Sequence, residues 1–189
     1  MQWVKQALPI NADNCLRRAR DGDLDAFDAL FVEHEKVVFS IALRFMGRRP
    51  DAQELTQDVF MLLHAALGQI VDPQHLRHWL LRTVTHRCLD RLRNDRRRPQ
   101  LVPIETLDPD SEPAAPETEA DPMARTRLRQ LLLELTPEAR AVMLLRFQED
   151  LDPPEIATLL EMPVNTVKSH LRRSLEWMRA QCAGDDHGS

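Results

Sequence analysis

The chain contains little glycine: Gly22, Gly47, Gly68, Gly184 and Gly188 are the only ones among 189 residues. They are too scattered to form a glycine-rich loop whose backbone amides cradle a phosphate, so a P-loop is excluded. Long apolar runs are also missing, and no segment is suited to span a bilayer. The opening residues, MQWVKQALPINADN, lack the apolar stretch of a secretory signal. We therefore expect a cytoplasmic protein with no membrane insertion.

Cysteine is scarce as well. Cys15, Cys88 and Cys182 are far apart, and no CxxC pair occurs, which argues against a disulfide framework and a zinc ribbon. His86 and Cys88 have no second pair of ligands near them in the sequence, so they do not predict a metal site. We expect no metal, no cofactor and no catalytic residue, and hence a protein that is not an enzyme.

Excess positive charge is absent overall, since the formal net charge is −5, but the charges are unevenly distributed. From Arg82 to Arg98 there are seven arginines and two aspartates, a local balance of +5. Residues 99–122 contain seven acids, no Lys or Arg, and six prolines. A basic segment of this kind, beside an acidic one, favours a nucleic-acid partner that the net charge conceals.

Helical periodicity dominates the first hundred residues. Apolar side chains recur at three- and four-residue steps from Phe27 to Phe45, and Gly47 is placed to end that helix. A second helix is predicted over about 51–67 and a third over about 75–94. The prolines and acids of 99–122 disfavour both a helix and a packed core, which predicts a flexible, self-repelling linker.

The region after the linker shows stronger local signals. Leu128, Leu131, Leu132 and Leu135 form an apolar stripe, and Thr136-Pro137-Glu138 is typical of a helix start. Asp152-Pro153-Pro154-Glu155 predicts a capping box, followed by a short helix and a turn. The last helix, from about Val164, has an apolar back and a basic, polar front. This succession is the helix-turn-helix pattern.

These patterns predict an all-α protein of two small helical domains. The domains are expected at 1–98 and 123–189, joined by the flexible acidic, proline-rich linker 99–122, with the helix-turn-helix in the second domain.

The same residues resemble the extracytoplasmic-function group of the sigma-70 family of bacterial RNA polymerase sigma factors. In the first domain the resemblance rests on Asp25-Ala26-Phe27, on the segment DAQELTQDVF (51–60), and on Trp79-Leu80 through Asp90-Arg91-Leu92-Arg93. In the second it rests on LTPE (135–138), EIA (155–157) and PVNTVKSHL (163–171). The order and spacing of these segments make the signal specific. The resemblance implies a polymerase subunit that directs promoter recognition and DNA opening.

The resemblance implies two protein partners. The helix over 51–60 matches the one that docks on the clamp of the largest subunit of the polymerase core, and the beta-subunit flap of the core is also an expected partner. An anti-sigma factor is a further expected partner. The residues predicted to bind core are Asp51, Glu54, Gln57, Asp58 and Phe60.

Promoter DNA is the third expected partner. On the side of the −10 element, the predicted residues are Asp72, Gln74, His75, Arg82, His86, Arg93 and Arg97. Segment 71–75 matches the loop that in this family captures an unstacked base, although it lacks the Arg-Gly often found there. The basic side of the following helix is suited to phosphates.

The last helix matches the reader of the −35 element in the major groove. Its predicted DNA-binding residues are Asn165, Thr166, Lys168, Ser169, His170, Arg172 and Arg173. Asn165 stands where the family commonly has glycine, and His170 and Leu175 stand where arginine is common. These departures affect the expected base preference more than the docking in the groove.

Other classes of protein fit the sequence less well. A helix-turn-helix regulator that binds DNA without the polymerase is the main alternative. One of the two-component type is disfavoured, because residues 1–98 lack the βαβ pattern of a receiver domain. A helical hydrolase or metal enzyme would have to use Glu33, His34 and Glu35, which point in different directions on a helix. A protein that only binds polymerase is distinguished by testing promoter-specific transcription.

Overall fold

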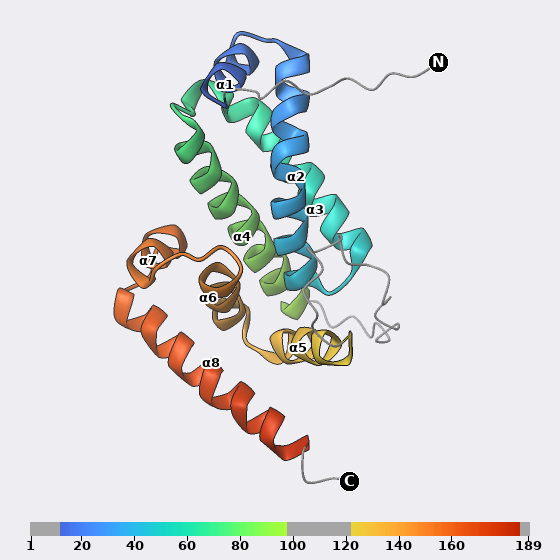
Figure 1. Cartoon of the computed structure of the whole chain (residues 1–189), viewed down its shortest axis with the longest axis vertical. Helices are drawn as coiled ribbons and strands as arrows, with labels where there is room; N and C mark the ends of the chain where they lie inside the picture. The colour runs from blue at the N-terminus through green and yellow to red at the C-terminus, as the bar shows by residue number, and fades with distance from the viewer. Residues whose placement is uncertain (1–11, 98–121, 186–189) are drawn as a thin grey trace.

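The computed structural model describes residues 12–97 and 122–185, which form helices and contain no strand (Figure 1). We call these two ranges the N-terminal half and the C-terminal half. The elements are α1 (Ala12–Arg20), α2 (Leu24–Met46), α3 (Arg49–Ala66), the 3-10 turn η1 (Leu67–Gln69), α4 (Pro73–Arg97), α5 (Pro122–Glu134), α6 (Pro137–Phe147), α7 (Pro153–Leu160) and α8 (Val164–Asp185). The predicted all-α fold with two helical parts is confirmed. The predicted linker lies, except for Pro122, outside the described residues.

The N-terminal half is built on three long helices, α2, α3 and α4, with α1 packed across one end of α2 (Figure 1). Their inner faces are apolar: Leu30, Ile41 and Phe45 of α2 are at most 1% exposed, as are Leu63 of α3 and Leu81 of α4. Buried apolar side chains of this size contribute about 1.5–3 kcal/mol each by transfer from water. Packing between the three helices therefore supplies most of the stability of this half.

Gly47 ends α2, as the sequence predicts. Its φ of 74° is the left-handed conformation of a helix C-cap, and its N–H donates to the carbonyl oxygen of Leu43 at 2.8 Å. A Cβ at this position would lie 3.1 Å from Cδ1 of Leu133, a residue of α5. The lack of a side chain at Gly47 thus permits both the left-handed turn and the close approach of the C-terminal half.

Side-chain caps define the helices of the C-terminal half. The hydroxyl of Thr136 accepts from the backbone N–H of Ala139 at the start of α6. Asp152 and Glu155 form the predicted capping box at the start of α7, with reciprocal bonds of 2.8 and 2.7 Å. Glu161 ends α7 in the left-handed conformation, and α8 follows at Val164. The predicted helix-turn-helix is therefore present as α7 and α8.

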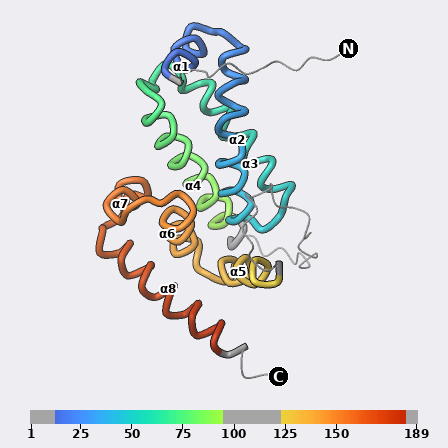
Figure 2. Tube along the Cα trace, in the orientation of Figure 1, coloured from blue at the N-terminus to red at the C-terminus, as the bar shows by residue number. Residues whose placement is uncertain are grey.

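The two halves pack against each other. Helices α5 and α6 lie on α2, and α6 and α7 lie on α4, while α8 extends away from the first half (Figures 1 and 2). The buried apolar residues of both halves belong to one continuous core. The sequence predicted the helical parts but not this contact between them.

Three local features differ from the sequence-based expectations. Helix α1 was not predicted, and α4 begins at Pro73, so Gln74 and His75 belong to its first turn instead of a loop. Leu128, expected on an apolar stripe, is 52% exposed. The stripe is nevertheless real, because Leu131 on the same helix is 1% exposed.

Candidate nucleic-acid and polymerase interfaces

Helix α4 has an apolar face and a polar, basic face. Leu81, Val84 and Cys88 are at most 1% exposed. Burial raises the pKa of the Cys88 thiol to about 12, although the nearby Arg140 acts in the opposite direction. We call Arg82, His86 and Arg93 the basic row: at 100° per residue they share one side of α4. Arg97 is in the last turn of the helix, and its side chain lies outside the described residues.

Each member of the basic row contacts the C-terminal half. Arg82 donates to the carboxylate of Glu161. His86 Nε2 lies 3.0 Å from the carbonyl oxygen of Leu159. Arg93 donates to Glu138 Oε1 at 3.1 Å. The groups that contact the basic row thus belong to α6, to α7 and to the C-cap of α7.

A further set of polar contacts joins the halves along α2 and α4. Arg77 of α4 forms an ion pair of 3.0 Å with Glu149, whose side chain is 6% exposed. Arg44 of α2 donates to Gln148 Oε1 at 2.9 Å. Arg129 of α5 donates to the carbonyl oxygen of Gly47 at 3.0 Å. These bonds bring the C-terminal half against the end of α2.

Arg140 is the buried centre of this contact. It is 6% exposed and donates to carbonyl oxygens of both halves: Phe45 in α2, and Leu132 at 2.8 Å in α5. A buried guanidinium is costly unless its N–H groups are satisfied, and carbonyls at helix ends are well placed to satisfy it. Local sequence signals gave no indication of this role.

The segment before α4 is tightly turned. The carboxylate of Asp72 accepts from the backbone N–H of His75 at 2.6 Å, and His75 Nδ1 accepts from the N–H of Val71 at 3.2 Å. Asp72 therefore caps the N-terminus of α4. Gln74 is exposed and His75 is half-buried. Asp72 and His75 consequently have structural roles that the sequence did not predict.

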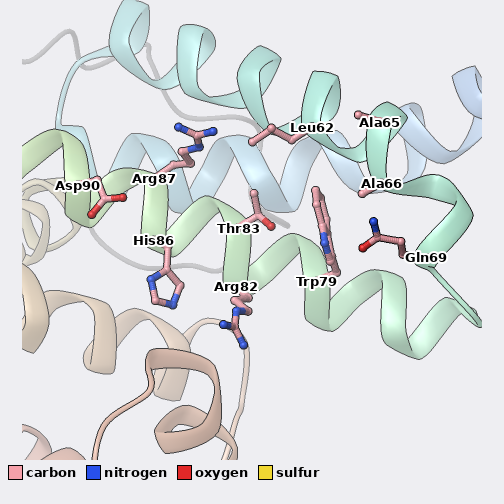
Figure 3. A pocket seen from close by; sticks show the side chains of 10 residues that line it. All are labelled: Leu62, Ala65, Ala66, Gln69, Trp79, Arg82, Thr83, His86, Arg87 and Asp90. Carbon is pink, nitrogen blue, oxygen red and sulfur yellow. The ribbon is translucent and has the colours of Figure 1, made fainter.

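A cleft of about 520 Å³ lies between α3 and α4, close to this segment (Figure 3). Figure 3 shows Trp79 and Thr83 of α4 facing Leu62 and Ala66 of α3, whereas Arg82 and His86 turn toward the C-terminal half. The cleft is lined by Leu62, Ala65, Ala66, Gln69, Trp79, Arg82, Thr83, His86, Arg87 and Asp90. An aromatic wall with polar groups at the rim is suited to a flat, polar ring.

The predicted core-binding face of α3 is only partly free. Gln57 and Asp58 are exposed. The carboxylate of Glu54 accepts from Arg91 of α4 at 2.8 Å, and this hydrogen bond holds the pKa of Glu54 below its usual range. Asp51 lies 3.7 Å from the same guanidinium. These two acids thus tie α3 to α4.

Phe60, predicted as part of this face, is buried. It is 4% exposed, and its ring centroid lies 4.5 Å from that of Phe31 in α2. Its side chain lines an apolar groove between α2 and α3, together with Phe27, Phe31, Phe39, Met61 and others. Phe60 therefore belongs to the core beneath the exposed side of α3. This differs from its predicted direct contact with the polymerase core.

Helix α8 presents the predicted DNA-reading residues on its outer side. Asn165, Thr166, Lys168, Arg172 and Arg173 are exposed, and Ser169 and His170 are half-buried. The opposite side packs on α6 and α7 through residues that include Val167 and Met178. Arg172 pairs with Glu176 at 3.1 Å, whereas Arg173 has no ion-pair partner among the residues that the structure describes.

A long basic helix in one half and an open helix-turn-helix in the other define a DNA-binding protein. Comparison with known families finds two matches: Sigma-70 region 2 over residues 30–98 and Sigma-70, region 4 over residues 125–178. Together they cover well over half of the chain. The chain belongs to the sigma-70 family of RNA polymerase sigma factors.

Two curated relatives show the similarity along the chain. The RNA polymerase sigma-H factor of Pseudomonas aeruginosa is 26% identical over 170 residues, covering 85% of this chain and 88% of the relative. The extracytoplasmic-function (ECF) sigma factor SigW of Bacillus subtilis is 24% identical over 177 residues, covering 88% and 94%. The chain is accordingly a sigma factor of the extracytoplasmic-function group.

A solved structure has the same fold. The sigma factor RpoE of Bartonella quintana, crystallised in complex with the anti-sigma factor NepR, superposes with a TM-score of 0.67 at 17% identity. The match covers 82% of this chain and 94% of the other. No helix among the described residues is long and apolar enough to cross a membrane.

Proposed function

We propose that this sigma factor binds core polymerase through α3 and reads the two promoter elements with opposite ends of the molecule. The observation that carries the proposal is the pairing of an exposed reading face on α8 with a basic row on α4. The phosphodiester chemistry belongs to the polymerase, and the chain itself contributes binding energy and positioning.

Core docking is assigned to the exposed part of α3. Gln57 and Asp58 project from a rigid helix whose other side is fully packed. The groove beside them, lined by Phe27, Phe31 and Met61, offers apolar surface next to this polar rim. An apolar centre with a polar rim is the usual anatomy of a protein interface. The clamp of the largest subunit fits this face, and the beta-subunit flap is assigned to the C-terminal half.

The −10 element is assigned to α4 and the cleft beside it. The basic row neutralises phosphates, each of which adds a salt-dependent increment of affinity. An unstacked base enters the cleft against Trp79, where stacking is worth about 1–3 kcal/mol per base. Trapping of such bases drives opening of the duplex. Asp72 contributes by holding the first turn of α4 in place, and Gln74 is the exposed polar side chain next to the base.

The −35 element is assigned to α8 in the major groove. Arg173 is assigned to hydrogen bonds with a guanine. Lys168 and Arg172 lie at the sides of the reading face and are assigned to phosphates of the DNA backbone. Asn165, Thr166, Ser169 and His170 supply further polar contacts. An anti-sigma factor is the expected regulator, and the cytoplasm is the expected location.

Selection of DNA by the reconstituted holoenzyme tests this assignment. Genomic fragments retained by core polymerase plus this protein are compared with those retained by core alone. We expect the added protein to enrich fragments that share two short elements, one near −35 and one near −10. Enrichment of fragments that share only one element would contradict the proposal. So would a lack of enrichment although the protein binds core polymerase.

A further inference from the structure

We propose that α1 carries a second site for single-stranded DNA, in which Arg17 and Arg20 bind backbone phosphates next to the captured −10 base. The proposal rests on the proposed function, because it extends the −10 site assigned to α4 and to segment 71–75. The ligand is the part of the opened strand that leads toward the transcription start. Its binding through phosphates does not depend on the base sequence.

A cleft of about 350 Å³ lies between α1 and the segment that precedes α4. It is lined by Asp13, Asn14, Leu16, Arg17, Arg20 and Val71. Its volume is at the lower end of the range of about 300–1,000 Å³ for ligand sites, which suits a unit of the size of a nucleotide. The two arginines supply positive charge for the backbone, and the two aliphatic side chains supply apolar surface for a sugar or a base.

The two arginines lie one turn apart on the exposed side of α1. Arg17 donates to Asn14 Oδ1 at 3.0 Å, which orients its guanidinium along the helix surface. Arg20 has no ion-pair partner among the residues that the structure describes. Asp13, the acid of the cleft, is about 10 Å from Arg20 along the helix axis. A phosphate is therefore expected at the Arg20 end of the cleft, away from this carboxylate.

Helix α1 is fixed firmly to the rest of the N-terminal half. Cys15 and Leu16 are at most 3% exposed, and Cys15 Sγ donates to the carbonyl oxygen of Ala26 at 3.2 Å. Arg18 pairs at 2.6 Å with Asp23, the N-cap of α2. The helix thus presents the cleft on a rigid element, and the binding of DNA does not have to order the backbone first.

Val71 connects the cleft to the predicted base-capturing segment 71–75. Its side chain is 69% exposed, although it is apolar. Its backbone N–H donates to His75 Nδ1 at 3.2 Å, which holds the residue in place before α4. An apolar side chain held at this position is suited to contact the sugar or base that follows the captured one.

The position of α1 sets the direction of the strand. Helix α1 contacts η1 and α4, and it lies with the first turn of α4 at the end of the N-terminal half remote from α6, α7 and α8 (Figure 1). The −35 face is on α8, and the −35 element precedes the −10 element in the promoter. A strand that passes from α4 over segment 71–75 to α1 therefore runs toward the transcription start.

Holoenzyme binding to two single strands tests the site. Both fluorescent strands carry the −10 element found by the fragment selection, in the DNA strand that the wild-type holoenzyme prefers. The short strand ends at the element, and the long strand continues by a few nucleotides of mixed sequence toward the start. The variant Arg17→Gln/Arg20→Gln is compared with Lys36→Gln/Arg179→Gln, which removes the same charge from exposed positions of α2 and α8. Each variant is first shown to bind core polymerase as the wild type does.

We expect the arginine variant to bind the long strand about fivefold to about tenfold more weakly than the control, and the short strand equally well. The salt slope on the long strand should fall by about one unit. Val71→Ser removes apolar surface but no charge, and it keeps the N–H that bonds His75. It should weaken the long strand about threefold and leave the salt slope unchanged.

Equal affinity of the arginine variant and its control for the long strand would overturn the proposal. An equal loss on both strands would overturn it as well, because the arginines would then act on the −10 site itself. If the wild-type holoenzyme bound the long strand no more tightly than a scrambled strand, the proposed function would fail, and this site with it.

Discussion

Arg172 and Arg173 are neighbours in sequence but differ in surroundings. Arg172 pairs with Glu176 one turn further along α8, at 3.1 Å. Arg173 is exposed and points away from the apolar side of the helix, formed by Val167 and Leu171. The pairing orients Arg172 along the edge of α8, where a phosphate is the natural partner. Arg173 is free to enter the groove without unpacking the domain.

Replacing these arginines separately should distinguish base reading from phosphate binding. We expect Arg173→Ala to cost about 1–3 kcal/mol on a cognate −35 duplex and to reduce discrimination at one or two base pairs. Arg172→Ala should weaken binding to all duplexes alike and reduce the salt slope by about one unit. Both are measured by salt titration of the full chain on cognate and base-substituted duplexes. A uniform loss for Arg173→Ala would make it a phosphate contact and disprove our assignment of the reading face.

Thr85 is a second informative residue. It lies on the buried side of α4 and is fully covered, and its hydroxyl has no hydrogen-bond partner among the described residues. An unsatisfied buried polar group is destabilising by about 1–3 kcal/mol. We expect Thr85→Val, which keeps the shape and removes the hydroxyl, to raise the free energy of unfolding by about 1 kcal/mol. Thr83→Val, at a half-buried site, is the control and should stay within about 0.5 kcal/mol.

Urea denaturation measures this effect as a shift in midpoint at constant slope. A lower midpoint for Thr85→Val than for the wild type would indicate that the hydroxyl has a partner in solution.

Helix α3 carries acids that stabilise the fold next to residues that we assign to a partner. Its N-terminal acids, Asp51 and Glu54, bind Arg91 and so fix α3 against α4. One turn further on, Gln57 and Asp58 are exposed. A reversal of charge at Glu54 would therefore disturb the fold as well as the interface. Asp58 is the position at which the docking of core polymerase is tested cleanly.

We expect Asp58→Lys to weaken the binding of core polymerase by about tenfold, because an exposed carboxylate suits a basic partner surface and a lysine would meet like charge there. The affinity is measured by fluorescence anisotropy of the labelled full chain. Glu33→Lys, an equal change of charge at an exposed position of α2, is the control and should leave the affinity unchanged. If Asp58→Lys retains wild-type affinity and an unchanged circular dichroism spectrum, another face of the chain docks on core.

Sequence patterns predicted the elements whose signals are local. Gly47, Thr136 and the Asp152–Glu155 box act within a few residues of their partners, so α2, α6 and α7 could be placed from the sequence. Phe60 was assigned to the core-binding face from the family resemblance, and its burial was not predicted. Only the packing of α2 against α3 buries its ring on Phe31.

The contact between the halves could not be predicted in this way. Arg140 and Phe45 are separated by 95 residues, and Arg93 and Glu138 by 45. No periodicity or capping motif links positions so far apart, and Arg140 lies in α6 between the buried residues Ala139 and Ala141. The contacts of Arg82, His86 and Arg93 with the C-terminal half were likewise not predicted from the sequence.

At the scale of the whole molecule, the two predicted DNA-binding surfaces differ in their surroundings. The predicted −35 residues of α8 are mostly exposed, whereas Arg82, His86 and Arg93 of α4 contact the C-terminal half. In the proposed function the polymerase supplies the catalysis and this protein supplies the promoter specificity.

Transcription in vitro from a duplex promoter tests this account most directly. Core polymerase is supplied with the full chain, nucleotides and a fragment selected by the holoenzyme, without any activator that hydrolyses nucleotides. We predict a transcript of defined length that depends on the added protein and is strongly reduced by Arg173→Ala. A transcript level no higher than that of core alone, although the protein demonstrably binds core, would contradict the account.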